Sequence, residues 1–245
     1  MVNSLITQFK INKLTRMPRK TSGMVSLGGF KFNYIDAASF LSTYKSIFTD
    51  RVYHFISNKE NPRILDCGAN IGLASIYLRS VFPKAIITAF EPDPIIIGIL
   101  KKNLAPANVE VIEAAVWNQS GEISFKSDGA DGGCLEPNQL GCSVPTIRLA
   151  DWLQEPIDFL KIDIEGAELP VLRDCGNLLK FVQNIAVEYH ESSNGSQNLD
   201  ELLKILSDNG FRYHLHSKRQ PIKPLANRFG PKNCGQMLDI FACRV

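Results

Sequence analysis

The 245-residue sequence contains no hydrophobic run that approaches the ~20 residues needed for a transmembrane helix. Residues 1–20 also lack the apolar core and the small-residue cleavage site of a secretory signal. The composition is that of an ordinary globular protein, with 44% hydrophobic and 21% charged residues. We therefore expect a cytoplasmic protein with one large α/β domain, or with one domain and a small extension.

Metal-binding cysteine patterns are missing as well. The six cysteines form no C-x-x-C pair and no spacing typical of a zinc site, which favours reduced thiols. Two of them, Cys134 and Cys142, flank a glycine-rich loop and could pair with each other. The net charge of +2 is too small to indicate a nucleic-acid partner by itself.

Acidic residues are absent from two segments. Residues 1–23 carry only basic charges, and we expect a loosely ordered arm that is either solvated or in contact with an anionic substrate or membrane surface. Residues 217–236 form a basic, proline-containing loop without an acid. Residues 25–35 predict a short hairpin around a glycine pair, which gives an N-terminal arm and hairpin over 1–35.

Strands and helices alternate through the rest of the chain, which predicts a parallel sheet with helices on both faces. A helix is expected over residues 36–57, where Asp36 can cap and aromatic residues recur at helical spacing, and it would cover the site as a lid. The segments predicted to contain strands are 63–72, 85–94, 109–116, 158–168, 181–190, 211–215 and 237–245.

Two features break this alternation. No helical pattern separates the last two predicted strands, so one strand should be antiparallel to its neighbours. Residues 117–150 contain a long irregular stretch, which we expect to be an insertion that faces the substrate.

One turn combines glycines with an acid. The stretch RILDCGANIG, residues 63–72, predicts a buried strand, a tight turn through Asp66, Gly68 and Asn70, and a helix that starts near Gly72. The glycines would let the backbone approach a ligand, and the helix N-terminus offers free N–H groups. The turn lacks the G-x-G-x-x-G spacing of dinucleotide sites, and its carboxylate would repel a diphosphate.

A second acid, Glu91, follows 25 residues after Asp66, at the end of the next predicted strand. A carboxylate there can accept two hydrogen bonds from ribose hydroxyls. An adenosine ligand with a cationic, amino-acid-bearing tail would satisfy both acids, and S-adenosylmethionine is that ligand. Ligands of open α/β sheets bind at the carboxyl ends of the strands. Polar residues collect at four such ends: 66–72, 91–93, 163–168 and 188–190.

The patterns D-x-G-A-N-x-G, F-E-P-D, K-I-D-I-E-G-A-E and V-E-Y-H, in this order, resemble the FkbM-type family of S-adenosylmethionine-dependent methyltransferases. The resemblance extends over residues 40–216. It implies the Rossmann-like class I methyltransferase fold, an α/β sheet of about seven mostly parallel strands with one antiparallel strand and helices on both faces. It further implies that residues 36–245 form a single methyltransferase domain.

The resemblance also assigns the cofactor site. It implies that four turn residues hold the methionine end of the cofactor: Asp66, Gly68, Asn70 and Gly72. Glu91 is expected to hold the ribose. The further candidates are Ala69, Pro92 and Asp93, with Ala114, Ala115 and Trp117 on the adenine side. Family members usually methylate hydroxyls of sugars, glycans or secondary metabolites, and this substrate class is inherited from the resemblance alone.

The residues themselves point to oxygen as the methyl acceptor. An N-P-P-Y-like element, common in nitrogen methylation, is replaced by Asp163-Ile164-Glu165-Gly166, and no P-C motif is present for cytosine methylation. A hydroxyl is a poor nucleophile and needs a base. The candidate bases are Asp163, Glu165 and His190, and Lys161 can orient or stabilise. No metal is required, although Asp163 and Glu165 could hold a divalent ion that lowers the pKa of the hydroxyl.

Two other functions stay open at this stage. The domain could bind the cofactor without turnover, or it could methylate RNA through the basic arm and the 211–236 loop. The same basic run suits an anionic sugar, a nucleotide-sugar or a lipid-linked acceptor. The favoured partner is therefore a hydroxyl-bearing small molecule or glycan, which could be anionic, rather than a nucleic acid.

Overall fold

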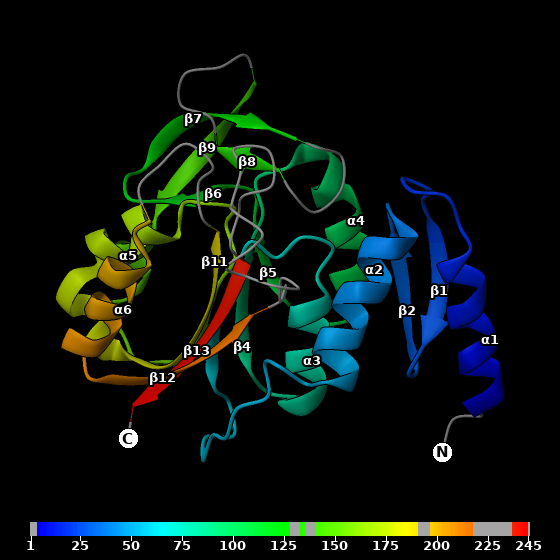
Figure 1. Cartoon of the computed structure of the whole chain (residues 1–245), viewed down its shortest axis with the longest axis horizontal. Helices are drawn as coiled ribbons and strands as arrows, with labels where there is room; N and C mark the ends of the chain where they lie inside the picture. Colours follow the sequence, from blue (N-terminus) through cyan, green and yellow to red (C-terminus); the bar gives the residue numbers. More distant parts are fainter. Residues whose placement is uncertain (1–3, 128–132, 136–140, 191–196, 218–236, 245) are drawn as a thin grey trace, which may run out of the picture.

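The computed structural model describes residues 4–127, 133–135, 141–190, 197–217 and 237–244. At its centre is a seven-stranded sheet. From edge to edge its strands are β12 (Phe211–Ser217), β13 (Met237–Arg244), β11 (Val182–His190), β10 (Ile157–Ile162), β3 (Arg63–Cys67), β4 (Ile86–Phe90) and β5 (Glu110–Ile112). Helices α3 (Leu73–Val81) and α4 (Pro94–Leu104) cover one face of the sheet, and α5 (Glu168–Cys175) and α6 (Leu199–Asp208) cover the other (Figure 1).

The strand directions confirm the predicted sheet. Neighbouring strands from β5 to β11 run parallel, whereas β13 runs antiparallel to both β11 and β12. The chain builds β3, β4 and β5 outward and then returns to β10 on the other side of β3, so the strand order reverses between β3 and β10. Ligands of open α/β sheets bind at such a switch point. The pairing of Asp66 with Lys161 sets the turn after β3 beside the end of β10.

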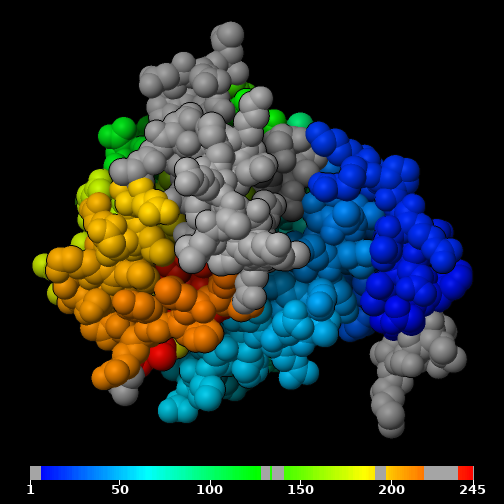
Figure 2. Space-filling model, in the orientation of Figure 1, coloured from blue at the N-terminus to red at the C-terminus, as the bar shows by residue number. Residues whose placement is uncertain are grey.

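The N-terminal residues are more ordered than the sequence indicated. In place of a loosely ordered arm the structure has helix α1 (Ser4–Thr15), because Leu14 is buried in one hydrophobic cluster with Leu27 and Phe32. The predicted hairpin is confirmed as β1 (Gly23–Leu27) and β2 (Phe30–Tyr34), which pair antiparallel. In the space-filling view these blue residues form the flank opposite the orange α6 and β12 segment (Figure 2).

The helix predicted over residues 36–57 is shorter than expected. Helix α2 (Ala37–Tyr44) begins after Asp36, whose carboxylate accepts the amide of Ser39 at 3.0 Å. It continues as a π-helical segment, η1 (Lys45–Thr49), and ends there. Tyr44 stacks on Phe48 with 4.8 Å between ring centroids, so these aromatics pack together. No residue of this segment lines the pocket described below, and its role as a lid stays a prediction.

Asn103 of α4 ties the hairpin to the turn after β3. Its buried side chain accepts the amide of Asn33 at 2.8 Å, and donates to the carbonyls of Asn33 at 2.9 Å and Ile71 at 2.8 Å. Because Asn103→Ala leaves these buried groups unpaired, we expect it to lower the free energy of unfolding by about 2–4 kcal/mol. Urea denaturation measures this, with the exposed Asn12→Ala as control. A loss no larger than that of the control would contradict the expectation.

The segment predicted as one strand, 109–116, is divided between two sheets. Strand β5 ends at Ile112, the amide of Ala114 donates to the carbonyl of Ile112 at 3.0 Å, and the chain bends away. A second, four-stranded sheet then forms, in the order β6 (Ala115–Trp117), β9 (Cys142–Arg148), β7 (Gly121–Lys126) and β8 (Cys134–Leu135). The irregular segment 117–150 therefore contains a small sheet of its own.

Helix α3 begins directly after Gly72, where the sequence predicted a helix to start. Helix α3 ends before Pro83, and α4 starts with Pro94 after the capping residue Asp93. Two 3-10 helices, η2 (Leu149–Trp152) and η3 (Gly176–Phe181), precede β10 and β11. Within the described residues no helix is long and apolar enough to cross a membrane.

Two sequence expectations fall wholly or partly outside the described residues. Cys142 is a free thiol, and nothing is described of the Cys134 side chain, with which a pairing was considered. Apart from Ser217, the basic loop 217–236 also lies outside the described ranges.

Candidate functional site

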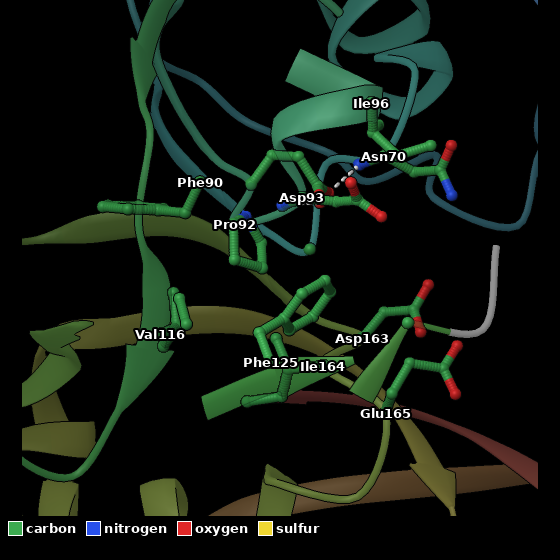
Figure 3. A pocket seen from close by; sticks show the side chains of 14 residues that line it. Asn70, Phe90, Pro92, Asp93, Ile96, Val116, Phe125, Asp163, Ile164 and Glu165 are labelled. Carbon is green, nitrogen blue, oxygen red and sulfur yellow. Dashed lines mark hydrogen bonds between the residues drawn. The ribbon is translucent and has the colours of Figure 1, made fainter. Parts of the chain in front are cut away.

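A pocket opens at the carboxyl ends of β3, β4 and β10 (Figure 3). It encloses about 600 Å³, part of which is open to solvent. The predicted site residues that line it are Gly68, Asn70, Glu91, Pro92, Asp93, Ala115, Asp163 and Glu165. Those that do not line it are Asp66, Ala69, Gly72, Lys161 and His190.

The turn after β3 needs glycine at two positions. Gly68 has φ +78°, and a Cβ added to it would lie 1.7 Å from the carbonyl oxygen of Asp163. Gly72 has φ +88°, and its Cβ would press on Leu100 and Leu104 of α4. The turn therefore fits between the end of β10 and α4 only without side chains, and Gly68 presents backbone to the pocket.

A buried ion pair supports this turn from behind. The Lys161 ammonium donates to the carbonyl of Gly68 at 2.7 Å, and lies 3.3 Å from Asp66 and 3.5 Å from Asp163. Burial alone would lower the pKa of Lys161, but Asp66 and Asp163 raise it well above the usual value, so the ammonium is charged. Asp66 is fully buried and also accepts the Ser75 hydroxyl at 2.7 Å.

Asp66 and Lys161 lie behind the turn and do not line the pocket. Asp66 was predicted to hold the cofactor and Lys161 to orient or stabilise in catalysis, and both roles stay predictions. In the structure Lys161 donates to the Gly68 carbonyl and pairs with Asp66. These contacts fix the turn, and Lys161 also lies beside Asp163.

Glu91 at the end of β4 is the buried acid of the pocket. Its two oxygens accept the amides of Asn70 at 2.8 Å and Asp93 at 3.0 Å. Burial raises its pKa to about 7, and these two hydrogen bonds oppose the rise. A carboxylate oxygen has two lone pairs, so both oxygens can still accept hydroxyl protons from a ligand.

The side of the pocket away from Asp163 and Glu165 is apolar. Figure 3 shows Val116 of β6 on that side, with Phe125 of β7 between the two sides and Ile96 of α4 beside Asn70. Trp117 does not line the pocket, since it is packed against the second hydrophobic core, and Ala114 is buried outside the lining as well. Phe125 comes from the 117–150 segment, so at least this part of the segment faces the pocket.

The opposite end carries carboxylates. Asp163 and Glu165 follow β10, and Figure 3 shows both side chains extending in the same direction beside the pocket. Glu165 has φ +54°, a left-handed conformation that is costly for a residue with a side chain. Burial, together with the charges of Asp163, Glu168 and Glu188, raises the pKa of Glu165 to about 8, against the lowering effect of His190.

His190 at the end of β11 is held among three acids. Its Nδ1 lies 3.0 Å from a Glu168 oxygen, and its Nε2 lies 3.5 Å from oxygens of both Glu165 and Glu188. Burial lowers the pKa of His190, but Glu168 and its neighbours outweigh this and raise it to about 11. The ring is therefore an imidazolium at neutral pH. A protonated ring cannot accept the hydroxyl proton, so the raised pKa of His190 favours Asp163 and Glu165 over His190 among the predicted bases.

Asp163, Glu165 and His190 are close enough to hold a metal ion, with one ligand atom from each within 4.8 Å of the others. A protonated imidazole has no lone pair for a metal, and His190 already supplies positive charge to the carboxylates. We therefore expect dialysis against EDTA to change methyl transfer by less than about twofold. Activity that vanishes with EDTA and returns with Mn²⁺ would contradict this expectation.

Sequence reasoning gave no role to several residues of the site. Glu168 is buried and bonds His190, yet in sequence it is one more acid of a charged cluster. Phe125 and Ile96 reach the pocket from elements whose packing has no local signature. The alternation Ile123, Phe125 marked one face of β7 as apolar, but not which sheet or pocket that face meets.

The strand order with one antiparallel strand, and a pocket at the point where that order reverses, define the class I methyltransferase fold. The sequence model of the methyltransferase FkbM domain matches residues 66–213, more than half of the chain. The chain therefore belongs to the FkbM methyltransferase family, as the resemblance predicted.

Known proteins agree with this assignment. Methyltransferase sdnD of Sordaria araneosa is 30% identical over 211 residues, covering 69% of this chain and 80% of that protein. The 31-O-demethyl-FK506 methyltransferase FkbM of Streptomyces tacrolimicus is 25% identical over 221 residues, which cover 73% of this chain and 84% of that protein. The crystal structure of methyltransferase FkbM from Methylobacillus flagellatus superimposes with a TM-score of 0.50 at 18% identity, covering 76% of this chain and 45% of that chain, which supports the fold.

Proposed function

We propose that this methyltransferase transfers the methyl group of S-adenosylmethionine to a hydroxyl oxygen of a sugar, glycan or secondary metabolite. The observation that carries the proposal is the division of one pocket into three chemical parts. An apolar end at Val116 and Phe125 suits adenine, the buried acid Glu91 suits ribose hydroxyls, and the carboxylates Asp163 and Glu165 suit a cationic tail.

The residues present fit this cofactor. The approach of Gly68 to Asp163 leaves room only for backbone, which suits a ligand that lies against the turn. The negative end favours a positively charged sulfonium and ammonium, whereas a diphosphate would be repelled there. When bound, S-adenosylmethionine supplies a methyl group activated by the positive charge on sulfur.

Glu165 is the proposed proton acceptor. His190 is already protonated, and the charge of Asp163 is compensated by Lys161 at 3.5 Å, which leaves Glu165 as the pocket carboxylate of highest proton affinity. The acceptor oxygen bonds to the methyl carbon, the carbon–sulfur bond breaks with its electron pair left on sulfur, and the hydroxyl proton passes to Glu165. Asp163 steadies positive charge at the transfer end.

Relatives support oxygen as the acceptor atom. Besides the 31-O-demethyl-FK506 methyltransferase, they include a 2-O-methyltransferase, NoeI, of Sinorhizobium fredii, and a hexuronic acid methyltransferase, AglP, of Haloferax volcanii. NoeI is 29% identical over 158 residues, and AglP is 31% identical over 141 residues. We extend this to the present chain as a hydroxyl acceptor of the sugar or metabolite class. The RNA alternative rests largely on the basic loop outside the described residues, and no observation on the described part favours it.

The proposal predicts a pH dependence of cofactor affinity. Two hydrogen bonds from ribose require Glu91 as a carboxylate. Because the pKa of Glu91 is raised to about 7, Glu91 of the free protein carries a proton below that pH and must release it when the cofactor binds. Calorimetric titration with S-adenosylmethionine should show an affinity about tenfold lower at pH 6 than at pH 8. Glu91→Gln should bind more weakly and without this dependence, whereas Glu110→Gln, outside the pocket, should behave as wild type. Wild type that fails to bind the cofactor at any pH would refute the proposal.

Turnover is tested with methyl glycosides of hexoses, deoxyhexoses and hexuronic acids, by following conversion of the cofactor to S-adenosylhomocysteine. Tight cofactor binding with no transfer to any hydroxyl would favour the alternative of a non-catalytic cofactor-binding domain. Formation of one methyl ether for each S-adenosylhomocysteine would support the proposed reaction.

A further inference from the structure

Glu168, the first residue of α5, has a carboxylate that is only 1% exposed and fully engaged. One oxygen accepts the amides of Ile164 at 3.2 Å and Gly166 at 3.1 Å, and the other accepts Gly166 at 3.1 Å. The first oxygen also lies 3.0 Å from Nδ1 of His190. A single buried side chain thus holds the backbone on both sides of Glu165 and the ring beside it.

Glu165 needs such support. Its φ of +54° is a left-handed conformation that costs conformational free energy in a residue with a side chain, and it persists only where the surroundings over-determine it. The amides of its two neighbours in the chain are fixed by Glu168. In this conformation Glu165 lines the pocket, with 28% of its side chain exposed.

His190 completes the arrangement from the next strand. With Nδ1 bonded to Glu168, its Nε2 is aimed at the carboxylates of Glu165 and Glu188, each 3.5 Å away. Within the described part of the chain this buried Nε2 has no hydrogen bond of its own. The His190 ring therefore acts on Glu165 as a nearby positive charge, and Glu168 sets the orientation of this ring.

We propose that Glu168 is a positioning residue for methyl transfer: through the amides of Ile164 and Gly166 and through the ring of His190, it holds the carboxylate of Glu165 at the pocket. This rests on the proposed function, in which Glu165 takes the proton of the acceptor hydroxyl. Glu168 itself is buried away from the pocket and does not touch substrate.

The charges around Glu165 make the proposal testable, because replacing different neighbours should shift the pKa of Glu165 in opposite directions. From its own loop it faces Asp163 and Glu168, and from β11 it faces Glu188 and His190. The carboxylates raise the pKa of Glu165 and the imidazolium lowers it. Removing the charge of Glu168 should therefore lower the pH at which Glu165 titrates, and removing the charge of His190 should raise it.

The experiment compares Glu168→Gln and His190→Gln in the full chain. The pH midpoint of Glu165 is read by ¹³C NMR of labelled glutamate carboxyls, with the signal assigned by its loss in Glu165→Gln. Cofactor affinity is measured by calorimetry, and kcat and KM with the best methyl glycoside. The control is Glu201→Gln, which removes an exposed carboxylate paired with Arg173 on the far side of α5.

We expect the midpoint to fall in Glu168→Gln and to rise in His190→Gln, with kcat of Glu168→Gln lower by about 10- to 100-fold at the pH plateau. Cofactor affinity should stay within about threefold in both variants, because Glu168 and His190 do not line the pocket. The proposal would be overturned if Glu168→Gln kept the wild-type kcat and the wild-type pH midpoint of Glu165. It would also be overturned if this midpoint shifted in the same direction in both variants. If wild type binds the cofactor but transfers no methyl group, the proposed function fails, and the NMR midpoints still decide the positioning role.

Discussion

Glu165→Gln should reduce kcat for methyl transfer by about 10²–10⁴-fold, the range usual for loss of a general base. The amide keeps the size of the side chain but cannot accept the hydroxyl proton. Affinity for S-adenosylmethionine should fall only about threefold, because in the proposed binding mode Asp163 still faces the cationic tail and Glu91 and Phe125 hold ribose and adenine. In wild type, kcat/KM should rise with pH and level off above about 8, because the base acts only when it has lost its proton.

The matched control for this variant is Glu155→Gln. Glu155 precedes β10 at the opposite end of the strand, is 75% exposed, and pairs with Arg63 2.8 Å away. It tests whether loss of any carboxylate near this strand affects turnover. A Glu165→Gln enzyme with wild-type kcat and pH profile would remove Glu165 from the reaction, and an equal loss in both variants would assign the effect to folding.

Gly68→Ala should abolish measurable cofactor binding and lower the free energy of unfolding by at least about 3 kcal/mol. Its new Cβ would lie 1.7 Å from the carbonyl oxygen of Asp163, so the backbone of the turn or of the β10 end must move. Either movement separates the turn from Lys161, which donates to the Gly68 carbonyl. Calorimetric titration with the cofactor and urea denaturation measure the two losses.

Gly176→Ala separates the two causes of this effect. Gly176 also has a positive φ, +45°, but nothing lies within 4 Å of an added Cβ, and it is remote from the pocket at the end of α5. In this variant the strained backbone alone should lower the free energy of unfolding, by about 1–3 kcal/mol, and cofactor affinity should be kept. Equal losses of stability in both variants, with cofactor binding intact in Gly68→Ala, would show that the close approach at the turn has no role.

The sequence could predict the alternation of strands and helices because each element carries its own periodicity. The turn at Gly68 was readable for the same reason, since its glycines and the helix start that follows are neighbours in the chain. The divided strand at residues 109–116 was not readable, because its apolar residues serve two different sheets. The helix of the N-terminal arm was missed because its stability comes from burying Leu14 against the hairpin rather than from its own pattern.

The site shows the same division between local and non-local information. That Asp163 and Glu165 lie at the mouth of a pocket followed from their place after a strand. The charge of His190 did not, because it depends above all on Glu168, which approaches it only in the fold. The burial of Asp66 behind the turn was likewise set by its partner Lys161 on the neighbouring strand. Spacing along the chain carries no information about such pairs.

The central claim, methyl transfer to oxygen by Glu165-assisted attack, is tested most directly with S-adenosylmethionine carrying a ¹³C-labelled methyl group. Purified protein and the best methyl glycoside acceptor are incubated at pH 8.5, and the product is followed by ¹³C NMR beside the Glu165→Gln variant. We predict a labelled methyl ether and an equal amount of S-adenosylhomocysteine with wild type, and almost none with the variant. A label found on nitrogen or carbon, or equal product from both proteins, would contradict the account.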